Sequence, residues 1–303
     1  MKLRRIRVDD RLELQRQGSD GRWTSHADRQ PLGGAVFDAT HELTTAARHL
    51  TLSEYLLPFQ PASFRDFLLY EKHNIDAARG LVRRFHPGQY RVTAGFEAVA
   101  HRPFPLFEPN RLFYKQPMYY MSNHLTFVPS GTPISTPSYS ESLDFELELG
   151  FVLSAPLRDA TPEEALAAIG AFVVLNDISA RDVQRAEMSS GFGPQKSKHF
   201  LNSMSATAVT ADEVLPQVDS LTGSVQINGV TVSTVSSAGM QWSLGEVLAH
   251  ASRSEQLIPG ELFGTGTLPG GSGMETGHWL ETGDTLTLAL DGIGHITHDI
   301  VGS

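Results

Sequence analysis

The segment from Leu143 to Leu149 alternates strictly between apolar and acidic residues, reading Leu-Asp-Phe-Glu-Leu-Glu-Leu. This two-residue period predicts a β-strand, because successive side chains of a strand point to opposite faces. Asp144, Glu146 and Glu148 then share one face. Carboxylates held so close raise one another's pKa unless water or a cation compensates them. The segment is therefore either a half-exposed strand with a solvated acidic face or one wall of a cation site.

Composition limits what such a site can be. The chain has 303 residues, of which 40% are hydrophobic and 19% charged, as in a globular protein of one or two domains. It contains no cysteine, which excludes zinc fingers, iron–sulfur centres and a cysteine nucleophile, so a metal here needs oxygen and nitrogen ligands. A formal net charge of −10 argues against binding nucleic acid or an anionic membrane through bulk charge.

The sequence shows neither a secretory signal nor an apolar stretch near the roughly 20 residues that span a bilayer. We therefore expect a soluble, cytoplasmic protein.

Periodicity and turn residues predict the order of elements. We expect a strand-rich N-terminal section, a helix from Ser63 to Phe85 that opens with a Ser63/Asp66 capping box, and a Gly-rich loop over residues 269–277. The other predicted elements are strands over 143–153, 171–175, 262–267, 284–290 and 294–301, helices over 161–170, 182–187 and 243–253, and a hairpin over 224–235 that turns at Asn228-Gly229.

Three further polar residues fit a cation site. Asp177 follows the apolar run 172–176, at the end of a predicted buried strand, where sheets often present functional groups. Asp66 and His73 lie seven residues apart, close to two turns of the predicted helix, so both would face one way. Glu146, Glu148 and Asp177 would satisfy a hard cation such as Mg²⁺, Mn²⁺ or Ca²⁺. A turn-capping Asp and a surface Asp/His pair are the structural alternatives.

Taken together, these segments resemble the fumarylacetoacetate hydrolase family. The resemblance extends over about 200 residues in the family's order. The matching segments are Asp66-Phe67 with His73, Ser130-Gly131-Thr132-Pro133-Ile134, Leu143 to Glu148, Asn176 to Gln184, a lysine loop near Lys198, and Gly264-Thr265-Gly266-Thr267.

The resemblance implies an α+β fold that is predominantly β: the family's mixed β-sandwich roll with a small N-terminal β section. It implies an N-terminal β domain over residues 1–60 and a catalytic domain over residues 61–303. It also implies a homodimer and a divalent cation, for which we expect Mg²⁺, with Mn²⁺ and Ca²⁺ as alternatives.

The resemblance also implies roles for particular residues. His73 matches the histidine that activates water, Glu275 the glutamate that orients it, and Lys198 the active-site lysine. The implied metal ligands are Asp66, Glu146, Glu148 and Asp177, and the implied substrate contacts are Tyr120, Arg181 and Gln184. The family's lysine loop reads Gly-Lys-Ser-Phe, whereas this chain reads Lys196-Ser197-Lys198-His199-Phe200, so Lys196 is an alternative to Lys198.

The predicted function is metal-dependent hydrolysis of a C–C bond in a 1,3-dicarbonyl or acylpyruvate substrate, with His73 activating water. The alternative on the same metal site is a decarboxylase or keto–enol tautomerase of 2-oxo acids. A non-catalytic cation-binding domain and metal-dependent phosphoryl transfer are two further hypotheses, although the chain lacks a Gly-x-x-x-x-Gly-Lys phosphate loop.

Overall fold

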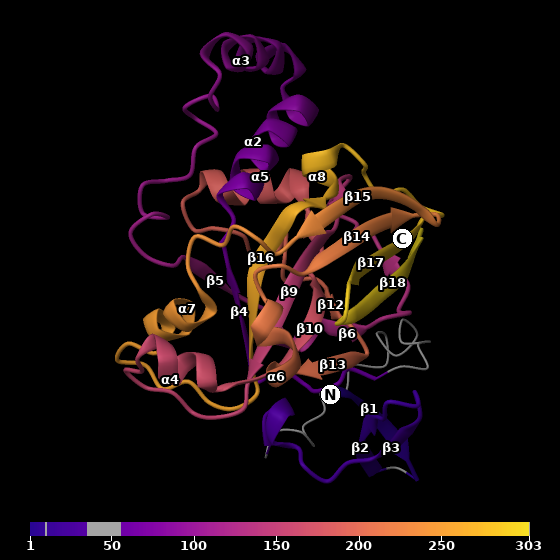
Figure 1. Ribbon diagram of the computed structural model, residues 1–303. Helices are drawn as coiled ribbons and strands as arrows, with labels where there is room; N and C mark the ends of the chain where they lie inside the picture. Colours follow the sequence, from indigo (N-terminus) through magenta and orange to yellow (C-terminus); the bar gives the residue numbers. More distant parts are fainter. Residues whose placement is uncertain (10, 35–55, 303) are drawn as a thin grey trace.

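The computed structural model describes residues 1–9, 11–34 and 56–302. Part of the predicted N-terminal section, residues 35–55, lies outside the described residues. The family-like, predominantly β α+β fold is confirmed: two packed β-sheets form the body, and helices cover their ends and edges (Figure 1). In the described part, no helix is both long and apolar enough to cross a membrane.

The larger sheet contains eleven strands of the described chain. In spatial order its main path consists of β3 (Trp23–Ser25), β2 (Arg11–Gln17), β1 (Lys2–Val8), β13 (Thr207–Thr210), β10 (Ile169–Asn176), β9 (Glu146–Leu153), β16 (Glu261–Ser272), β4 (Ser63–Phe67) and β5 (Tyr119–Ser122). Beside this path, β12 (Asn202–Met204) pairs with β10 and with β6 (Phe127–Pro129).

The smaller sheet has five strands, and a two-stranded ribbon lies beside the acidic segment. In order, the five are β15 (Val230–Ser236), β14 (Thr222–Ile227), β17 (Thr285–Leu290), β18 (Gly294–Val301) and β7 (Ile134–Ser135). The ribbon consists of β8 (Leu143–Asp144) and β11 (Ser179–Ala180). The predicted hairpin is confirmed, because Asn228 and Gly229 both have the positive φ that its tight turn requires.

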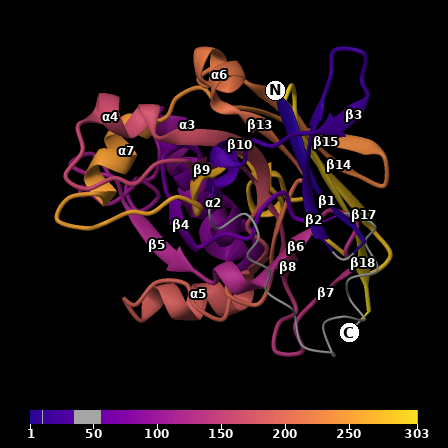
Figure 2. The ribbon, with the colours of Figure 1, turned by 90° about the horizontal axis from the view of Figure 1, so that it is seen from below.

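The helices gather at the ends of the sheets (Figure 1). They are α2 (Glu71–Phe85), α3 (Pro87–Ala100), α4 (Pro162–Ala167), α5 (Arg181–Ser189), α6 (Ala211–Val214), α7 (Leu244–Ala251) and α8 (Gly273–Thr276), with 3₁₀ turns η1 (Gln30–Leu32), η3 (His124–Thr126) and η4 (Leu215–Gln217). Capping boxes begin both α4, at Thr161, and α7, at Ser243, as the sequence predicts. Figures 1 and 2 show α4 and α7 together, away from α2 and α5.

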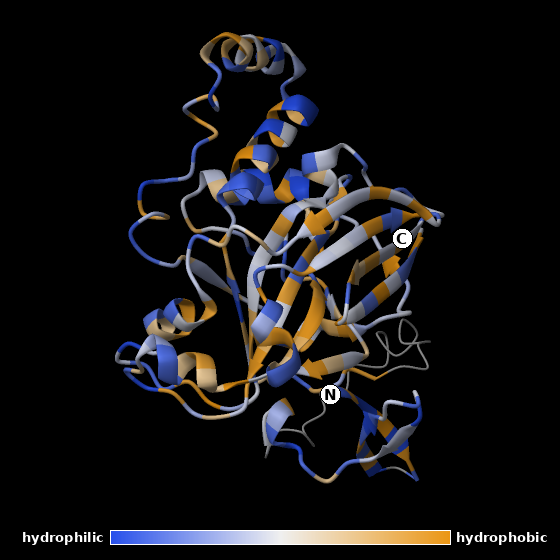
Figure 3. Ribbon diagram, in the orientation of Figure 1, coloured by the Kyte–Doolittle hydropathy of each residue, from blue (hydrophilic) through white to orange (hydrophobic). Residues whose placement is uncertain are grey.

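Both faces of β9 are covered, which decides between the two interpretations of the acidic segment. Leu147, Leu149 and Phe151 belong to the apolar core between the two sheets, whereas Val152 belongs to a second apolar cluster on the opposite face. The central strands are accordingly the most continuously apolar part of the ribbon (Figure 3). Glu146 is 5% exposed and Glu148 is fully buried, so the acidic face is not solvated.

The predicted helix from Ser63 to Phe85 is wrong in its first third. Residues 63–67 form β4, which pairs in parallel with β16 and antiparallel with β5, and α2 begins only at Glu71. Ser63 caps no helix, since its hydroxyl donates to Glu261 at 2.7 Å. The apolar residues of this segment are spaced three and four apart, which is the pattern of a helix. The strand is fixed by pairing with β16, whose residues lie about 200 positions away.

The predicted loop over residues 269–277 is also partly wrong. The strand β16 continues to Ser272, and α8 follows at once with a capping box between Ser272 and Glu275. Gly277, at φ 87°, ends this short helix. The Ser-x-x-Glu spacing was therefore a signal for a helix start.

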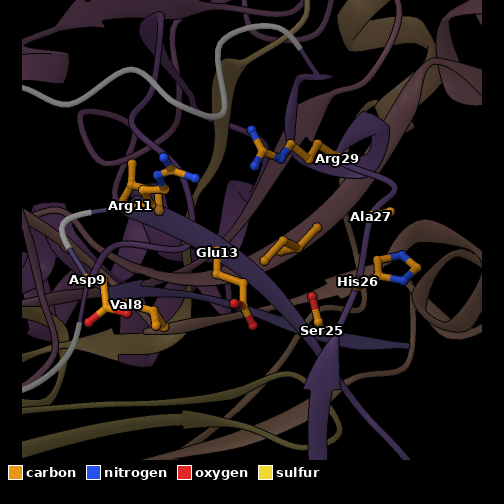
Figure 4. A pocket seen from close by; sticks show the side chains of 10 residues that line it. Val8, Asp9, Arg11, Glu13, Ser25, His26, Ala27 and Arg29 are labelled. Atoms are coloured by element: carbon orange, nitrogen blue, oxygen red, sulfur yellow. The ribbon is translucent and has the colours of Figure 1, made fainter.

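The N-terminal strands extend the large sheet, because β1 pairs with β13. A cavity of about 770 Å³ lies beside them, lined by Arg11, Glu13, His26 and Arg29 among others (Figure 4). Among the described residues, the side chains that could together hold a metal ion do not line this cavity. The domain boundary at residue 60 stays a prediction.

Candidate active site

A second cavity, of about 580 Å³, opens where β4, β9 and β16 meet α2, α5 and α8. It is lined by eight of the ten residues to which the resemblance gives a role, and the remaining two, Asp177 and Glu275, touch residues of its wall. The eight are Asp66, His73, Tyr120, Glu146, Glu148, Arg181, Gln184 and Lys198.

Three carboxylates come together from three strands. Asp66 lies on β4, Glu148 lies on β9, and Asp177 directly follows β10, as the sequence predicts for the end of that strand. One ligand oxygen from each lies within 4.8 Å of the other two, close enough to hold one metal ion. Asp66 reaches the other two carboxylates from β4, a strand that neighbours β16. The prediction that Asp66 shares one face of a helix with His73 is therefore wrong.

The chemistry of these oxygens fits a hard divalent cation. Asp66 Oδ1 and both oxygens of Glu148 are buried without a hydrogen-bond partner among the described residues. Burial raises the pKa of both carboxyl groups well above its usual range, and the neighbouring carboxylates raise it further. Gly264 of β16 leaves room for them, since a Cβ there would lie 2.5 Å from Asp66 Oδ1 and 2.6 Å from Glu148 Oε2.

Glu146 has different neighbours from the other three carboxylates. Arg181 Nη2 donates to its Oε1 at 2.7 Å, and Lys198 Nζ donates to its Oε2. These two cations outweigh the effect of burial and hold the pKa of Glu146 well below its usual range. Glu146 therefore anchors the two cations beside the carboxylate group, and its assignment as a fourth metal ligand stays a prediction.

Arg181 is buried, and each nitrogen of its guanidinium donates a hydrogen bond. Nε donates to Asp144 at 2.7 Å, Nη1 to Gln184 at 2.8 Å and Nη2 to Glu146. Asp144 also accepts from the backbone nitrogens of Gly273 and Met274, at the start of α8. The sequence placed Asp144 on the acidic strand face with Glu146 and Glu148; in the structure it joins α5 to the helix that carries Glu275.

Lys198, and not Lys196, reaches the site. Its ammonium group donates to Asp177 at 2.6 Å and to Glu146, and the side chain is 3% exposed. The two carboxylates outweigh burial and raise the pKa of Lys198, so it is charged. Lys196 instead points its ammonium group at the ring of Tyr139.

Tyr120 and Asn202 complete the surroundings of Asp177. The Tyr120 hydroxyl donates to Asp177 Oδ2 at 2.5 Å, and the Asn202 amide, turned so that its nitrogen faces acceptors, lies 2.8 Å from Asp177 Oδ1. Burial and the carboxylate raise the pKa of Tyr120, which therefore stays a neutral donor.

His73 and Glu275 form a pair at the wall of the cavity. His73 Nδ1 lies 3.1 Å from Glu275 Oε2, and His73 Nε2 lies 4.0 Å from Glu146 Oε1, on the side of the carboxylates. Burial alone would lower the pKa of His73, but Glu275 outweighs it and the pKa is raised. Glu275 is held in turn by the Ser272 hydroxyl and by the backbone nitrogens of Gly270 and Ser272.

The sequence of this chain matches a known family. The sequence model described as fumarylacetoacetate (FAA) hydrolase, C-terminal, matches residues 98–301, about two thirds of the chain. The chain belongs to the fumarylacetoacetate hydrolase family.

Relatives within the fumarylacetoacetate hydrolase family carry different activities. Mitochondrial oxaloacetate tautomerase of Homo sapiens is 26% identical over 207 residues, which cover 68% of this chain and 92% of that protein. The 2,4-didehydro-3-deoxy-L-rhamnonate hydrolase of a Sphingomonas strain is 28% identical over 189 residues, covering 62% of this chain and 66% of that protein.

Solved structures show the same fold. The 2-hydroxyhepta-2,4-diene-1,7-dioate isomerase of Mycobacterium marinum has a TM-score of 0.68 at 20% identity, covering 100% of this chain and 99% of that one. Fumarylpyruvate hydrolase of Pseudomonas aeruginosa, solved with Mn²⁺ and pyruvate, has a TM-score of 0.61 at 21% identity. The match covers 84% of this chain and 94% of that one. Family enzymes thus include both hydrolases and isomerases.

Proposed function

We propose that this protein is a divalent-metal-dependent hydrolase that cleaves a C–C bond in an acylpyruvate or related 1,3-dicarbonyl acid. One observation carries the proposal: His73, which is paired with Glu275, lines the same cavity as Asp66 and Glu148, and these two carboxylates form a group with Asp177. A hydrolase needs a group that activates water beside a group that polarises a carbonyl, and a tautomerase does not need the first.

Asp66, Glu148 and Asp177 are the proposed metal ligands, with Glu146 as the fourth that the resemblance implies. When bound, the cation supplies a Lewis acid that polarises the carbonyl oxygens of the substrate. We propose Mg²⁺ as the resident ion, since an all-oxygen set suits it, with Mn²⁺ and Ca²⁺ as alternatives.

His73 is the proposed general base. Glu275 Oε2 lies 3.1 Å from Nδ1, so Nε2 is the nitrogen on the side of the carboxylates and is the proposed acceptor of a proton from water. The oxygen of that water adds to the acyl carbonyl. The bond from this carbon to the methylene carbon then breaks, which gives a carboxylic acid and the enolate of pyruvate. The enolate carbon takes up a proton to give pyruvate, so water is the only other reactant.

Lys198 and Arg181 are the proposed source of positive charge for the developing anions. Both lie buried beside Glu146, so their charges are fixed in place before substrate arrives. Tyr120 and Gln184 are the other proposed substrate contacts, and both line the cavity.

The alternative is a tautomerase or decarboxylase of 2-oxo acids on the same residues. It is favoured by the human relative, which is an oxaloacetate tautomerase and is matched over 92% of its length. The buried cation Lys198 would stabilise an enolate in either reaction.

A product assay with metal-stripped protein tests the proposal. Acylpyruvate and oxaloacetate are offered with and without Mg²⁺ or Mn²⁺, and products are identified by mass. We expect metal-dependent release of pyruvate and a carboxylic acid from acylpyruvate, reduced at least about 100-fold in His73→Gln. His278→Gln, which changes an exposed histidine near α8, is the matched control. Enol-to-keto conversion or CO₂ release without fragments would support the alternative.

We also propose a homodimer in the cytoplasm, as the resemblance implies. Light scattering of the purified chain tests the assembly.

A further inference from the structure

The charges of two cations that line the cavity are already matched by buried carboxylates. Arg181 forms ion pairs with Asp144 and Glu146, and Lys198 forms ion pairs with Glu146 and Asp177. Both cations are therefore held beside the carboxylate group, where the reacting carbonyl would lie.

Arg185 is a third cation on the same wall. It follows Arg181 by four residues on α5, so both side chains emerge from one face of that helix, and both line the cavity. Within the described chain, no carboxylate lies within 4 Å of the Arg185 guanidinium. Its Nη1 lies 3.0 Å from His86 Nε2, and its guanidinium carbon lies 5.4 Å from the centroid of the Phe85 ring. The histidine nitrogen and the aromatic ring hold the guanidinium in place, and neither contact supplies a carboxylate.

Apolar side chains fill much of the cavity wall besides the carboxylate group and the cations. Ala77, Ala78 and Leu81 come from α2, Met188 from α5, and Met118 precedes β5. Such a wall accepts a hydrocarbon chain, and among the described lining residues Arg185 is a cation that no carboxylate pairs with.

We infer that Arg185 binds a second carboxylate of the substrate, at the end of its acyl chain. The inference rests on the proposed function for the reacting 2,4-dioxo acid group, and it extends that function to a dicarboxylic substrate: a 2-oxo acid head at the carboxylate site, a hydrocarbon middle along α2, and a terminal carboxylate on Arg185. A guanidinium suits this role because it donates two parallel hydrogen bonds to one carboxylate.

Paired substrates test the inference. Wild type and Arg185→Gln, both loaded with Mg²⁺, are assayed on 2,4-dioxoheptanedioate and on 2,4-dioxoheptanoate, which differ in the terminal carboxylate. We expect wild type to prefer the dicarboxylate about tenfold in kcat/KM, and Arg185→Gln to lose the preference through KM with the monocarboxylate nearly unaffected. Arg185→Lys should keep part of the preference for the dicarboxylate. Arg84→Gln is the control, because Arg84 stacks on Trp279 and does not line the cavity.

A titration separates this inference from the proposed reaction. 2-Oxoadipate and 2-oxohexanoate lack the cleavable 1,3-dicarbonyl, so their binding does not depend on hydrolysis. Tighter binding of 2-oxoadipate by wild type and not by Arg185→Gln would support the role of Arg185 even if neither dioxo acid is cleaved. A wild type without the preference, or an Arg185→Gln variant that keeps it, would overturn the inference.

Discussion

At the level of single residues, the carboxylate site destabilises the folded protein when no cation is present. Asp66 and Glu148 are buried with unpartnered oxygens and raised pKa values, so their ionised forms are disfavoured in the fold. The site is therefore arranged for binding at the expense of stability, as functional sites often are.

Glu148→Gln should separate these two effects. We expect the metal-free variant to melt about 2–4 °C above the metal-free wild type, because it lacks the Glu148 carboxyl group, whose ionised form the fold disfavours. We also expect Mg²⁺ to raise the melting temperature of wild type and hardly that of the variant. Thermal melts with and without MgCl₂ measure both, with exposed Glu163→Gln as control. A variant that still gains stability from Mg²⁺ would contradict the ligand assignment.

Single residues also show the limits of sequence reasoning. Glu146 and Glu148 were predictable because strand alternation is local, and Asp177 because it ends an apolar run. The spacing from Asp66 pointed to His73, but its pairing with Glu275 came only from the resemblance, since a histidine on a helix carries no signal of the glutamate 202 positions later that it meets. Strand alternation placed Asp144 on the acidic face without revealing its contact with Arg181, and Arg185 had no sequence signal.

Among the elements, α2 and α8 must lie close together for His73 to meet Glu275. Their contact is made at Gly80, where a Cβ would lie 1.8 Å from the carbonyl oxygen of Met274. No side chain fits there without moving one of the helices.

Gly80→Ala should therefore push α8 away from α2. We expect a loss of about 1–3 kcal/mol in the free energy of unfolding, and a fall in kcat as His73 and Glu275 separate. Gly95→Ala on α3 is the matched control, since nothing lies within 4 Å of a Cβ there and helix propensity predicts a gain of up to about 1 kcal/mol. Urea unfolding and steady-state kinetics measure both. Equal behaviour of the two variants would show that the close contact is unimportant.

Element prediction succeeded where the signal was local and failed where it was not. Capping boxes located α4 and α7, and Asn228-Gly229 located the hairpin. By contrast, β4 owes its conformation to pairing with β16, which the sequence around Ser63 does not encode.

For the whole molecule, His298 links the two sheets. It lies on β18 of the smaller sheet, and Nε2 lies 2.8 Å from the hydroxyl of Ser203 on β12 of the larger sheet. Its Nδ1 lies 2.7 Å from the carbonyl oxygen of Thr132. Because a carbonyl only accepts, Nδ1 carries the proton and Nε2 accepts from Ser203, which is the neutral form of the ring. Burial lowers the pKa of His298 to about 4.

This lowered pKa predicts acid sensitivity. The unfolded chain binds the proton near pH 6.5 and the folded chain only near pH 4, so the stabilisation is complete above pH 6.5 and is lost as pH falls toward 4. We expect the loss to reach about 3 kcal/mol. His298→Gln should be less stable than wild type at pH 7 and lose less between pH 6.5 and 4. Parallel curves of unfolding free energy against pH would refute the prediction.

The proposed function requires that water be added across a C–C bond at this site. Turnover of an acylpyruvate in H₂¹⁸O with Mg²⁺, followed by mass spectrometry, measures this addition. We expect one ¹⁸O atom in the carboxylate of the released acyl fragment, and loss of that product in His73→Gln. An acylpyruvate that is converted without fragments, or fragments that form without ¹⁸O in the acyl carboxylate, would show that the site does not hydrolyse this bond.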